Sequence, residues 1–116
     1  MFIESAGLPW HEPPGHVRGY SQYVVTPSDG RSERFDFRLS RYPVGGRVDP
    51  HVHEVAEQLY FFIEGAGTVL CGDETYQVGP GHTVLVAPGV VHAVENTGAV
   101  DLLFTVTTSP PDDIER

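Results

Sequence analysis

Turn-forming residues interrupt this chain so often that long regular elements are excluded. The 116 residues include 13 glycines and 10 prolines. No window of about 11 residues keeps the spacing of apolar positions that an amphipathic helix needs. Between the turn residues lie short runs of β-branched and aromatic residues, which are typical of strands. The pattern therefore predicts an all-β fold of about eight to ten short strands, either a sandwich or a small barrel.

The expected strands are placed by the turn residues that bound them. They cover residues 20–26, 34–42, 58–63, 66–71, 75–78, 82–87, 91–95 and 101–108. Residues 1–19, rich in proline, are expected to form an arm that packs on the barrel or on a neighbour. Residues 109–116 are expected to form an acidic, frayed tail. A chain of this length has room for one core, so residues 20–108 form the single expected domain.

The charge balance excludes whole classes of partner. Asp and Glu number 16 against 7 for Lys and Arg, which gives a formal net charge of −9, and every one of the cations is an arginine. A protein that binds nucleic acid or an anionic membrane needs a basic surface, and this composition supplies none. Chemistry that depends on a lysine is excluded as well.

The cysteine content and the N-terminal residues indicate the cellular compartment in which the protein is expected. Cys71 is the single cysteine, so the chain cannot form an internal disulfide. The N-terminal residues show neither the basic start nor the apolar stretch of a secretory signal, and no apolar run approaches the length of a membrane span. We therefore expect a cytoplasmic protein.

Three histidines are spaced as metal ligands would be. His51 and His53 are separated by one residue, and on a strand that spacing directs both side chains to the same face. His92 comes later in the chain, after enough residues for a hairpin and a return. A barrel can therefore bring His92 beside the pair, and we interpret the three as a metal site rather than as separate histidines.

The residues around these histidines resemble the two motifs of the cupin family. The first motif corresponds to Gly45-x5-His51-x-His53-x4-Gln58-x6-Gly65, and the second to Gly81-x5-Ala87-x-Gly89-x2-His92-x3-Asn96. The resemblance implies a cupin jelly-roll β-barrel, also called a double-stranded β-helix, with one divalent transition metal inside. It also implies a homodimer as the usual assembly.

The chain departs from the family pattern at two positions. Ala87 stands where the second motif has proline. Gln58 stands where the first motif has a glutamate ligand, although Glu57 could present a carboxylate in a shifted register. Because neighbouring strand residues face opposite sides, only one of the two can point at the metal. Gln58 is favoured, since Tyr60 and Phe62 would then share its inward face.

A glutamine ligand changes the charge of the site. Three neutral imidazoles and a neutral amide leave the charge of a divalent ion uncompensated, whereas a glutamate would neutralise half of it. Such a site is a stronger electrophile and favours anionic chelating ligands such as enolates, catecholates or 2-oxo acids. Three nitrogens and one oxygen suit Fe, Ni, Zn, Mn or Cu, and the ligand set does not choose among them.

Other residues qualify for roles around the metal. Tyr60 and Glu57 are the acid–base candidates that can be placed near it. Phe62 and Arg38 are the candidates for the substrate pocket, Arg38 through a bidentate contact with a carboxylate. Arg38 lies on the polar face of its strand, however, which we expect to be mainly solvated. His11 and His16 belong to the arm and could close over a pocket.

Two functions are consistent with these residues. The first is a metal-dependent enzyme acting on an anionic, oxygen-rich or aromatic small molecule, by dioxygenase-like or by isomerase, cyclase or lyase chemistry. The second is a non-catalytic module that binds a metal or a small ligand. One cupin with a glutamine ligand opens unsaturated uronate rings, but its C-terminal Asp-x-Phe segment has no counterpart near residues 106–108.

Overall fold

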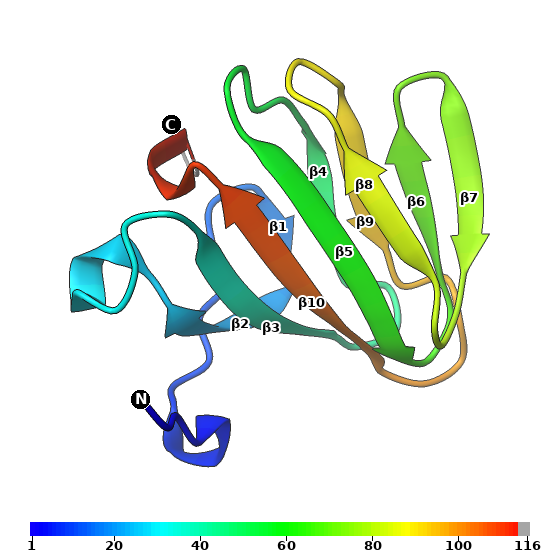
Figure 1. Ribbon diagram of the computed structural model, residues 1–116. Coiled ribbons are helices and arrows are strands. Elements are labelled where there is room, and N and C mark those ends of the chain that lie inside the picture. The colour runs from blue at the N-terminus through cyan, green and yellow to red at the C-terminus, as the bar shows by residue number, and fades with distance from the viewer. Residues whose placement is uncertain (114–116) are drawn as a thin grey trace.

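The computed structural model describes residues 1–113 and forms two facing β-sheets (Figure 1). The strands are β1 (His16–Val17), β2 (Tyr20–Val25), β3 (Asp36–Tyr42), β4 (Arg47–His51), β5 (Glu57–Glu64), β6 (Gly67–Cys71), β7 (Glu74–Val78), β8 (Thr83–Val86), β9 (His92–Glu95) and β10 (Leu102–Ser109). One sheet has the order β1-β4-β9-β6-β7 and the other β2-β3-β10-β5-β8, and all neighbours are antiparallel. The all-β prediction is confirmed.

Helical structure in the described residues is limited to short 3-10 turns. They lie at Ser5–Gly7, Pro27–Asp29 and Pro111–Asp113. Among residues 1–113, no helix has the length and apolar character needed to cross a membrane.

Two strands were not foreseen from the sequence. β4 contains Arg47, Asp49 and Pro50, which are weak strand formers, and tertiary pairing with β9 overrides their preference. β1 is two residues long and lies in the proline-rich arm, where it pairs with β4. The arm is therefore joined to the barrel by backbone hydrogen bonds before residue 20. At the other end β10 continues to Ser109, while residues 114–116 of the expected tail lie outside the described residues.

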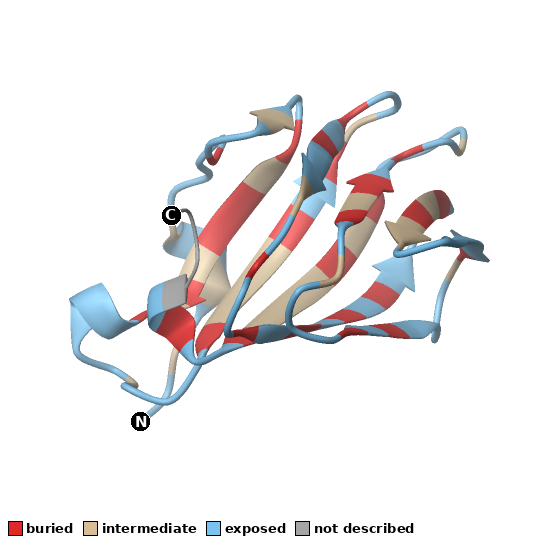
Figure 2. Cartoon of the chain, turned by 90° about the horizontal axis from the view of Figure 1, so that it is seen from above, coloured by how far each residue is buried: buried red, intermediate tan, exposed pale blue. Residues whose placement is uncertain are grey.

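The space between the two sheets is lined by apolar side chains at one end of the barrel and by polar side chains at the other. Alternating residues of most strands are buried, as the bands in Figure 2 show, whereas β7 is exposed except at Val78. We call the end of the barrel near Tyr42 the closed end and the end near Asp36 the open end. From the closed end to the open end, the inward residues are Tyr42, Ser40, Arg38 and Asp36 on β3, Leu102, Phe104, Val106 and Thr108 on β10, and Phe62, Tyr60 and Gln58 on β5. The interior thus runs from an apolar core to a polar cavity.

Aromatic rings fill the closed end. The centroid of the Phe104 ring lies 4.9 Å from that of Tyr42 and 5.1 Å from that of Phe62, and Phe62 and Phe104 are fully buried. Such aromatic pairs contribute stabilisation beyond the apolar area that they bury. These rings belong to one sheet, and they share a core cluster with Val48, Val69 and Val94 of the facing sheet. This end of the barrel therefore joins the two sheets and leaves the opposite end available for a site.

The polar face of β3 points into the barrel, so the expectation of a solvated face is wrong. Asp36 and Ser40 are 2% and 1% exposed, whereas Phe35, on the other face, is 40% exposed. Burial is tolerated because the polar groups have partners. Arg38 donates to Asp36 over 2.8 Å, and the Ser40 hydroxyl lies 2.8 Å from that of Ser21. Alternation identifies two faces of a strand, but not which one is inside.

Two residues of the histidine motifs, Gly65 and Asn96, have a structural role in the backbone rather than a role in the candidate site. Gly65 has a φ of +83°, and a Cβ there would collide with the carbonyl oxygen of Asp101. The Asn96 amide nitrogen donates to the carbonyl oxygens of Tyr42 (2.7 Å) and Val100 (2.8 Å), and its oxygen accepts from the Gly98 N–H (2.9 Å). Asn96 thus fixes the turn between β9 and β10 against the end of β3.

Candidate metal centre

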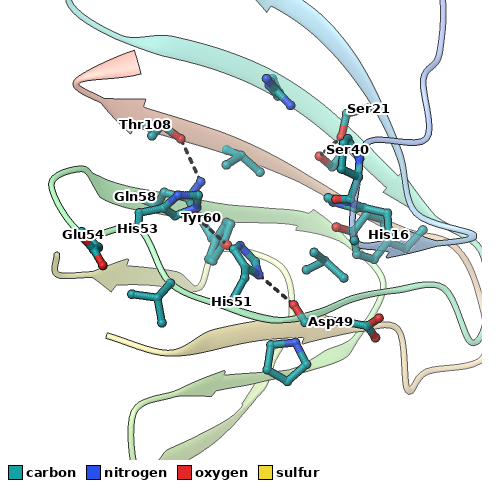
Figure 3. A pocket seen from close by; sticks show the side chains of 18 of the residues that line it. His16, Ser21, Ser40, Asp49, His51, His53, Glu54, Gln58, Tyr60 and Thr108 are labelled. Carbon is teal, nitrogen blue, oxygen red and sulfur yellow. Dashed lines mark hydrogen bonds between the residues drawn. The ribbon is translucent and has the colours of Figure 1, made fainter. Parts of the chain in front are cut away.

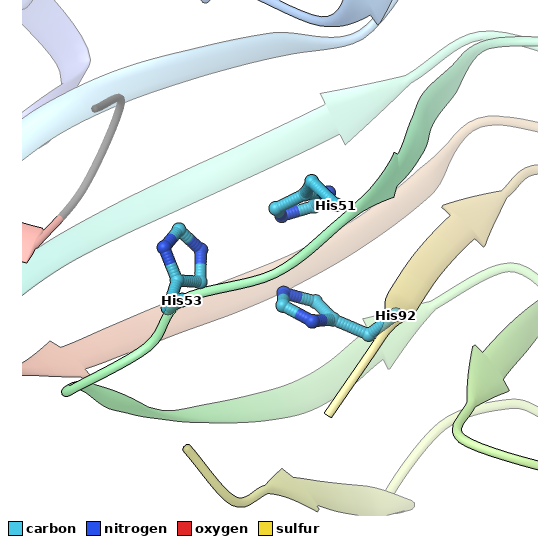
Figure 4. Close-up of side chains that lie close together, drawn as sticks. All are labelled: His51, His53 and His92. Carbon is cyan, nitrogen blue, oxygen red and sulfur yellow. The ribbon is translucent and has the colours of Figure 1, made fainter. Parts of the chain in front are cut away.

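Three histidine side chains converge at the open end of the barrel (Figure 4). One ring nitrogen from each of His51, His53 and His92 lies within 4.8 Å of the corresponding atoms of the other two. The His51 and His92 rings are the nearest pair, with centroids 4.1 Å apart. Antiparallel pairing explains the convergence of segments distant in sequence, since His51 of β4 lies opposite His92 of β9.

The two histidines of the first motif do not share a strand. β4 ends at His51, and His53 lies in the loop that follows. Between them, Val52 is 43% exposed, while His53 is 9% exposed. The alternation expected for a strand therefore persists past its end, and both imidazoles face inward as predicted.

Backbone hydrogen bonds fix the tautomers of two of these rings. The Nδ1 atom of His51 lies 2.8 Å from the carbonyl oxygen of Asp49, and Nδ1 of His92 lies 2.9 Å from that of Val90. Because a carbonyl oxygen can only accept, Nδ1 carries the hydrogen in each ring and Nε2 keeps the lone pair. This arrangement is typical of histidines that bind a metal.

The side chain of Gln58 is oriented by two neighbours (Figure 3). Its Nε2 atom donates to Oγ1 of Thr108, and its Oε1 atom accepts from the Tyr60 hydroxyl, each over 2.9 Å. Oε1 then lies 3.0 Å from Nε2 of His92. With the hydrogen of His92 on Nδ1, two lone pairs face each other, and a cation between them would satisfy both. The donor set therefore fits a divalent metal.

His51 and His92 are poor bases in this environment. Burial lowers the pKa of His92 to about 4, with smaller effects from His51 and His53. Burial also lowers the pKa of His51, and the neighbouring His53 and His16 add to the lowering. In both cases a backbone hydrogen bond partly opposes the shift. The imidazoles of His51 and His92 are therefore neutral at neutral pH, which is the form that coordinates metals.

The positions of Gln58 and Glu57 decide which of the two side chains faces the histidines. Gln58 is 6% exposed and lies beside the histidines, whereas Glu57 is exposed on the outer side of β5 and does not line the cavity. Strand alternation makes the two positions exclusive. The acid–base role considered for Glu57 is therefore wrong on geometric grounds.

A cavity of about 510 Å³ opens beside the three histidines. Of the residues proposed for it, Tyr60 and Arg38 line it, but Phe62 does not. Phe62 is fully buried in the aromatic core one row deeper along β5, so its assignment to the pocket is wrong. Burial raises the pKa of Tyr60, and its hydroxyl donates to Gln58. Tyr60 therefore orients the amide of Gln58.

Arg38 reaches the cavity from the opposite sheet. Its guanidinium pairs with Asp36 and lies 4.1 Å from the centre of the Tyr23 ring. The ion pair with a carboxylate and the cation–π contact hold a planar donor group at the cavity wall. This placement fits the expectation that Arg38 belongs to the pocket.

Among the residues that line the cavity, sequence reasoning missed Thr108. Thr108 anchors the amide of Gln58, and it lies opposite that residue in the pairing of β10 with β5. The inward alternation of β10 could have indicated it. His16, which the sequence placed in the arm as able to close over a pocket, lines the cavity from β1, whereas His11 does not. The strand itself was too short and too rich in neighbouring prolines to be recognised.

Solved structures of similar shape come from several bacteria. A predicted oxalate decarboxylase from Thermotoga maritima has a TM-score of 0.85 at 20% identity, and the match covers 94% of this chain and 98% of that one. The polyketide cyclase RemF from Streptomyces resistomycificus has a TM-score of 0.82 at 21% identity, covering 95% and 79%. KdgF from Halomonas sp. has a TM-score of 0.79 at 20% identity, covering 95% and 93%. At these identities the likeness shows the fold.

Sequence comparison identifies the family. An uncharacterized protein of Methanocaldococcus jannaschii is 33% identical over 69 residues, which are 60% of this chain and 55% of that protein. The chain thus spans little more than half the length of this relative. A family model described as the cupin domain matches residues 38–108, a stretch that holds both histidine motifs and most of the barrel. Fold, site and sequence agree, and the chain belongs to the cupin family.

Proposed function

We propose that this cupin is a metal-dependent enzyme that acts on a small anionic ligand carrying adjacent oxygen atoms. The observation that carries the proposal is the approach of Oε1 of Gln58 to Nε2 of His92 at 3.0 Å. Both atoms present lone pairs, both are buried, and they lie beside two further imidazoles. A divalent cation is the group that this arrangement accommodates.

The ligand class follows from charge and shape. A bound divalent ion supplies Lewis acidity toward ligand oxygens, and no protein carboxylate of the proposed set reduces its charge. Arg38, held by Asp36, offers donors to an anionic group at the opposite wall. Tyr60 and Thr108 keep the amide oxygen of Gln58 directed at the histidines. These residues favour oxalate, 2-oxo acids, enolates and catecholates.

The names of two similar structures are consistent with this ligand class. One is called a predicted oxalate decarboxylase and the other a polyketide cyclase, and both names denote oxygen-rich substrates. These names support the choice of the first compounds to assay, while the argument for the site depends on the side chains described above.

A non-catalytic binding module is the second candidate. It is favoured by the placement of the two acid–base candidates named from the sequence, since Glu57 faces outward and the Tyr60 hydroxyl donates to Gln58. The two candidates differ in turnover. Metal-loaded protein that binds oxalate or a catechol but leaves it unchanged, with and without oxygen, would favour the module.

Elemental analysis of the purified, untagged protein tests the metal site. We expect about one transition-metal ion per chain, and its loss from the double variant His51→Ala/His53→Ala. The matched control is His11→Ala/His82→Ala, which removes two histidines outside the cavity and should retain the ion. Absence of metal even after reconstitution would refute the proposed function.

The identity of the ion directs the search for a reaction. Iron or copper would lead to oxygen-consumption assays, and zinc or nickel to assays of isomerisation and cyclisation. In either case the chemistry should disappear in the His51→Ala/His53→Ala variant and persist in the matched control.

A further inference from the structure

Two serine hydroxyl groups form a pair in the wall of the cavity, apart from the three histidines. Ser21 of β2 lies opposite Ser40 of β3, and their Oγ atoms are 2.8 Å apart. Both serines are buried, and both line the same cavity as His51 and Gln58 (Figure 3). The pair is therefore a buried polar group at the cavity wall that does not belong to the candidate metal centre.

The hydrogen bonds of this pair are not completed by the protein. Each hydroxyl group has one hydrogen and two lone pairs, and the bond between the two oxygens uses one hydrogen, whichever serine donates it. Among residues 1–113, no other group hydrogen-bonds to either hydroxyl, so the second hydrogen has no acceptor. A buried donor without an acceptor costs free energy. An oxygen atom in the cavity would remove this cost, since a hydroxyl group can rotate toward it.

The register of the sheet places the serine pair deeper in the barrel than Gln58. Gln58 of β5 pairs with Thr108 of β10, and Thr108 pairs with Asp36 of β3, so these residues form one row at the open end. Ser40 lies two inward positions nearer the closed end of β3 than Asp36. Two inward positions span about 13 Å along a strand. A molecule as small as oxalate therefore cannot contact both the serine pair and the histidine end.

Apolar side chains line much of the cavity between these two polar regions. Val106 lies in the intervening row, opposite Tyr60 on one side and Arg38 on the other. Val48 of the facing sheet and Tyr42 at the closed end also line the cavity. The volume of about 510 Å³ is in the range of sites that enclose a small organic molecule. This wall suits a ligand with an apolar body and polar atoms at both ends.

We propose that the Ser21–Ser40 pair binds an oxygen atom at the far end of a ligand whose anionic head lies at the three histidines. The inference rests on the proposed function and narrows its ligand class to elongated anions with an apolar body and a distal hydroxyl or carbonyl oxygen. A 2-oxo acid that carries a hydroxylated aromatic ring has this form. The binding involves no covalent step.

Phenylpyruvate and 4-hydroxyphenylpyruvate test the role of the serine pair. They share the chelating head and the aromatic ring, and they differ by one hydroxyl group at the far end. Each is titrated without oxygen into the Co(II)-loaded protein, and the visible spectrum of the cobalt reports binding. We expect the wild type to bind 4-hydroxyphenylpyruvate about fivefold more tightly, the effect of one hydrogen bond, and Ser21→Ala/Ser40→Ala to bind both probes equally.

The variants separate a ligand contact from a structural effect. Both serines are replaced because one remaining hydroxyl could still donate, and removing both partners of a buried hydrogen bond leaves neither unsatisfied. The matched control is Thr68→Ala/Thr97→Ala, which removes a hydroxyl pair of the same 2.8 Å separation outside the cavity and should keep the preference. If the serine variant does not fold, as judged by thermal melting, Ser21→Cys/Ser40→Ala takes its place, since a thiol is only a weak donor.

The outcomes distinguish this inference from the proposed function. Oxalate is titrated alongside as a probe that reaches only the metal. If oxalate changes the cobalt spectrum, equal binding of the two elongated probes by the wild type, or a preference that persists in the serine variant, would overturn the role of the pair while the metal site stands. A wild type that takes up no Co(II), or whose spectrum responds to none of the three probes, would overturn the proposed function and this inference with it. A preference lost in the serine variant and kept in the threonine control supports both.

Discussion

In the proposed metal centre Gln58 is the ligand that sets the charge, and its replacement tests that role. In Gln58→Glu the carboxylate can accept from both Tyr60 and Thr108, so the side chain should keep its position. We expect the variant to retain the metal and to bind oxalate at least about fivefold more weakly, because half of the cation's charge is neutralised. Isothermal titration of the metal-loaded proteins with oxalate measures the difference.

The outer neighbour of Gln58 provides the control. Glu57→Gln changes the net charge by one unit of the opposite sign at a solvent-facing position, and oxalate affinity should stay close to that of the wild type. Unchanged or tighter oxalate binding by Gln58→Glu would show that Gln58 is not a ligand or that the electrostatic argument fails.

The buried histidines make the stability of the metal-free protein depend on pH. Folding lowers the pKa of His92 from 6.5 to about 4, and that of His51 in the same direction. Between these pH values the unfolded chain binds protons more readily than the folded one. The free energy of unfolding is therefore highest above about pH 6.5 and falls as the pH decreases toward the folded pKa.

Thermal melting between about pH 7 and pH 5 measures this effect, since most carboxylates titrate below that range. His92→Gln removes the group with the larger shift and should show a smaller decrease. A melting temperature that is constant or rises as the pH falls would contradict the assignment of neutral, buried imidazoles.

Most of the candidate metal site was predictable from single residues, and the remainder of the cavity depended on three-dimensional contacts. The histidines and Gln58 occur in motifs with fixed spacing, and strand alternation correctly favoured Gln58 over Glu57. Phe62 was assigned to the pocket because it shares the inward face of β5, but alternation does not give depth along a barrel. His16 lies on a two-residue strand that no periodicity can reveal.

At the scale of elements, Asn96 connects the β9–β10 turn to β3. Asn96→Ala removes three hydrogen bonds and leaves the carbonyl oxygens of Tyr42 and Val100 without this donor. We expect a loss of roughly 2–4 kcal/mol in the free energy of unfolding, which corresponds to a decrease of about 10 °C or more in melting temperature. Differential scanning calorimetry measures it.

A nearby surface residue supplies the comparison for Asn96. Thr97→Ala removes an exposed hydroxyl pair with Thr68, so its effect should stay within about 0.5 kcal/mol. Equal effects of the two substitutions would mean that the turn is held by contacts other than the Asn96 amide.

Eight strands were placed to within about two residues by turn residues and β-branched runs, since those signals are local. β4 was missed because it contains charged residues and a proline and depends on its partner for pairing. The inward face of β3 was misjudged for a related reason. Its polar residues are compensated by Ser21 and by each other, contacts that a single strand does not disclose.

At the scale of the molecule, the outer face of β5 and β8 carries a patch of apolar residues, with Glu57 next to it at the start of β5. Leu59, Phe61 and Ile63 of β5 and Leu85 of β8 are 37–61% exposed on the same side of the sheet. We propose that a second copy of the chain covers this face in a homodimer. Two copies that each carry −9 repel one another, and an apolar patch is where they can approach with the least repulsion.

Light scattering coupled to gel filtration tests the assembly. The wild type should have twice the monomer mass of 12.7 kDa. Leu85→Glu should give monomers, because two carboxylates would be buried across the interface. Val100→Glu alters an equally exposed residue in a loop and should remain dimeric. A monomeric wild type would refute the proposal.

Along β3, β10 and β5 the inward side chains change from apolar to polar. This gradient separates the residues that stabilise the barrel from the residues that line the cavity. Rows near Phe62 and Phe104 determine whether the chain folds, and the rows near Gln58 and Thr108 determine what it binds. Substitutions confined to the open rows can therefore alter ligand choice while the aromatic end maintains stability. A barrel built in this way can acquire new ligand specificities through substitutions in one cross-strand row at a time. Each variant along such a series can still fold, because the aromatic end is unchanged.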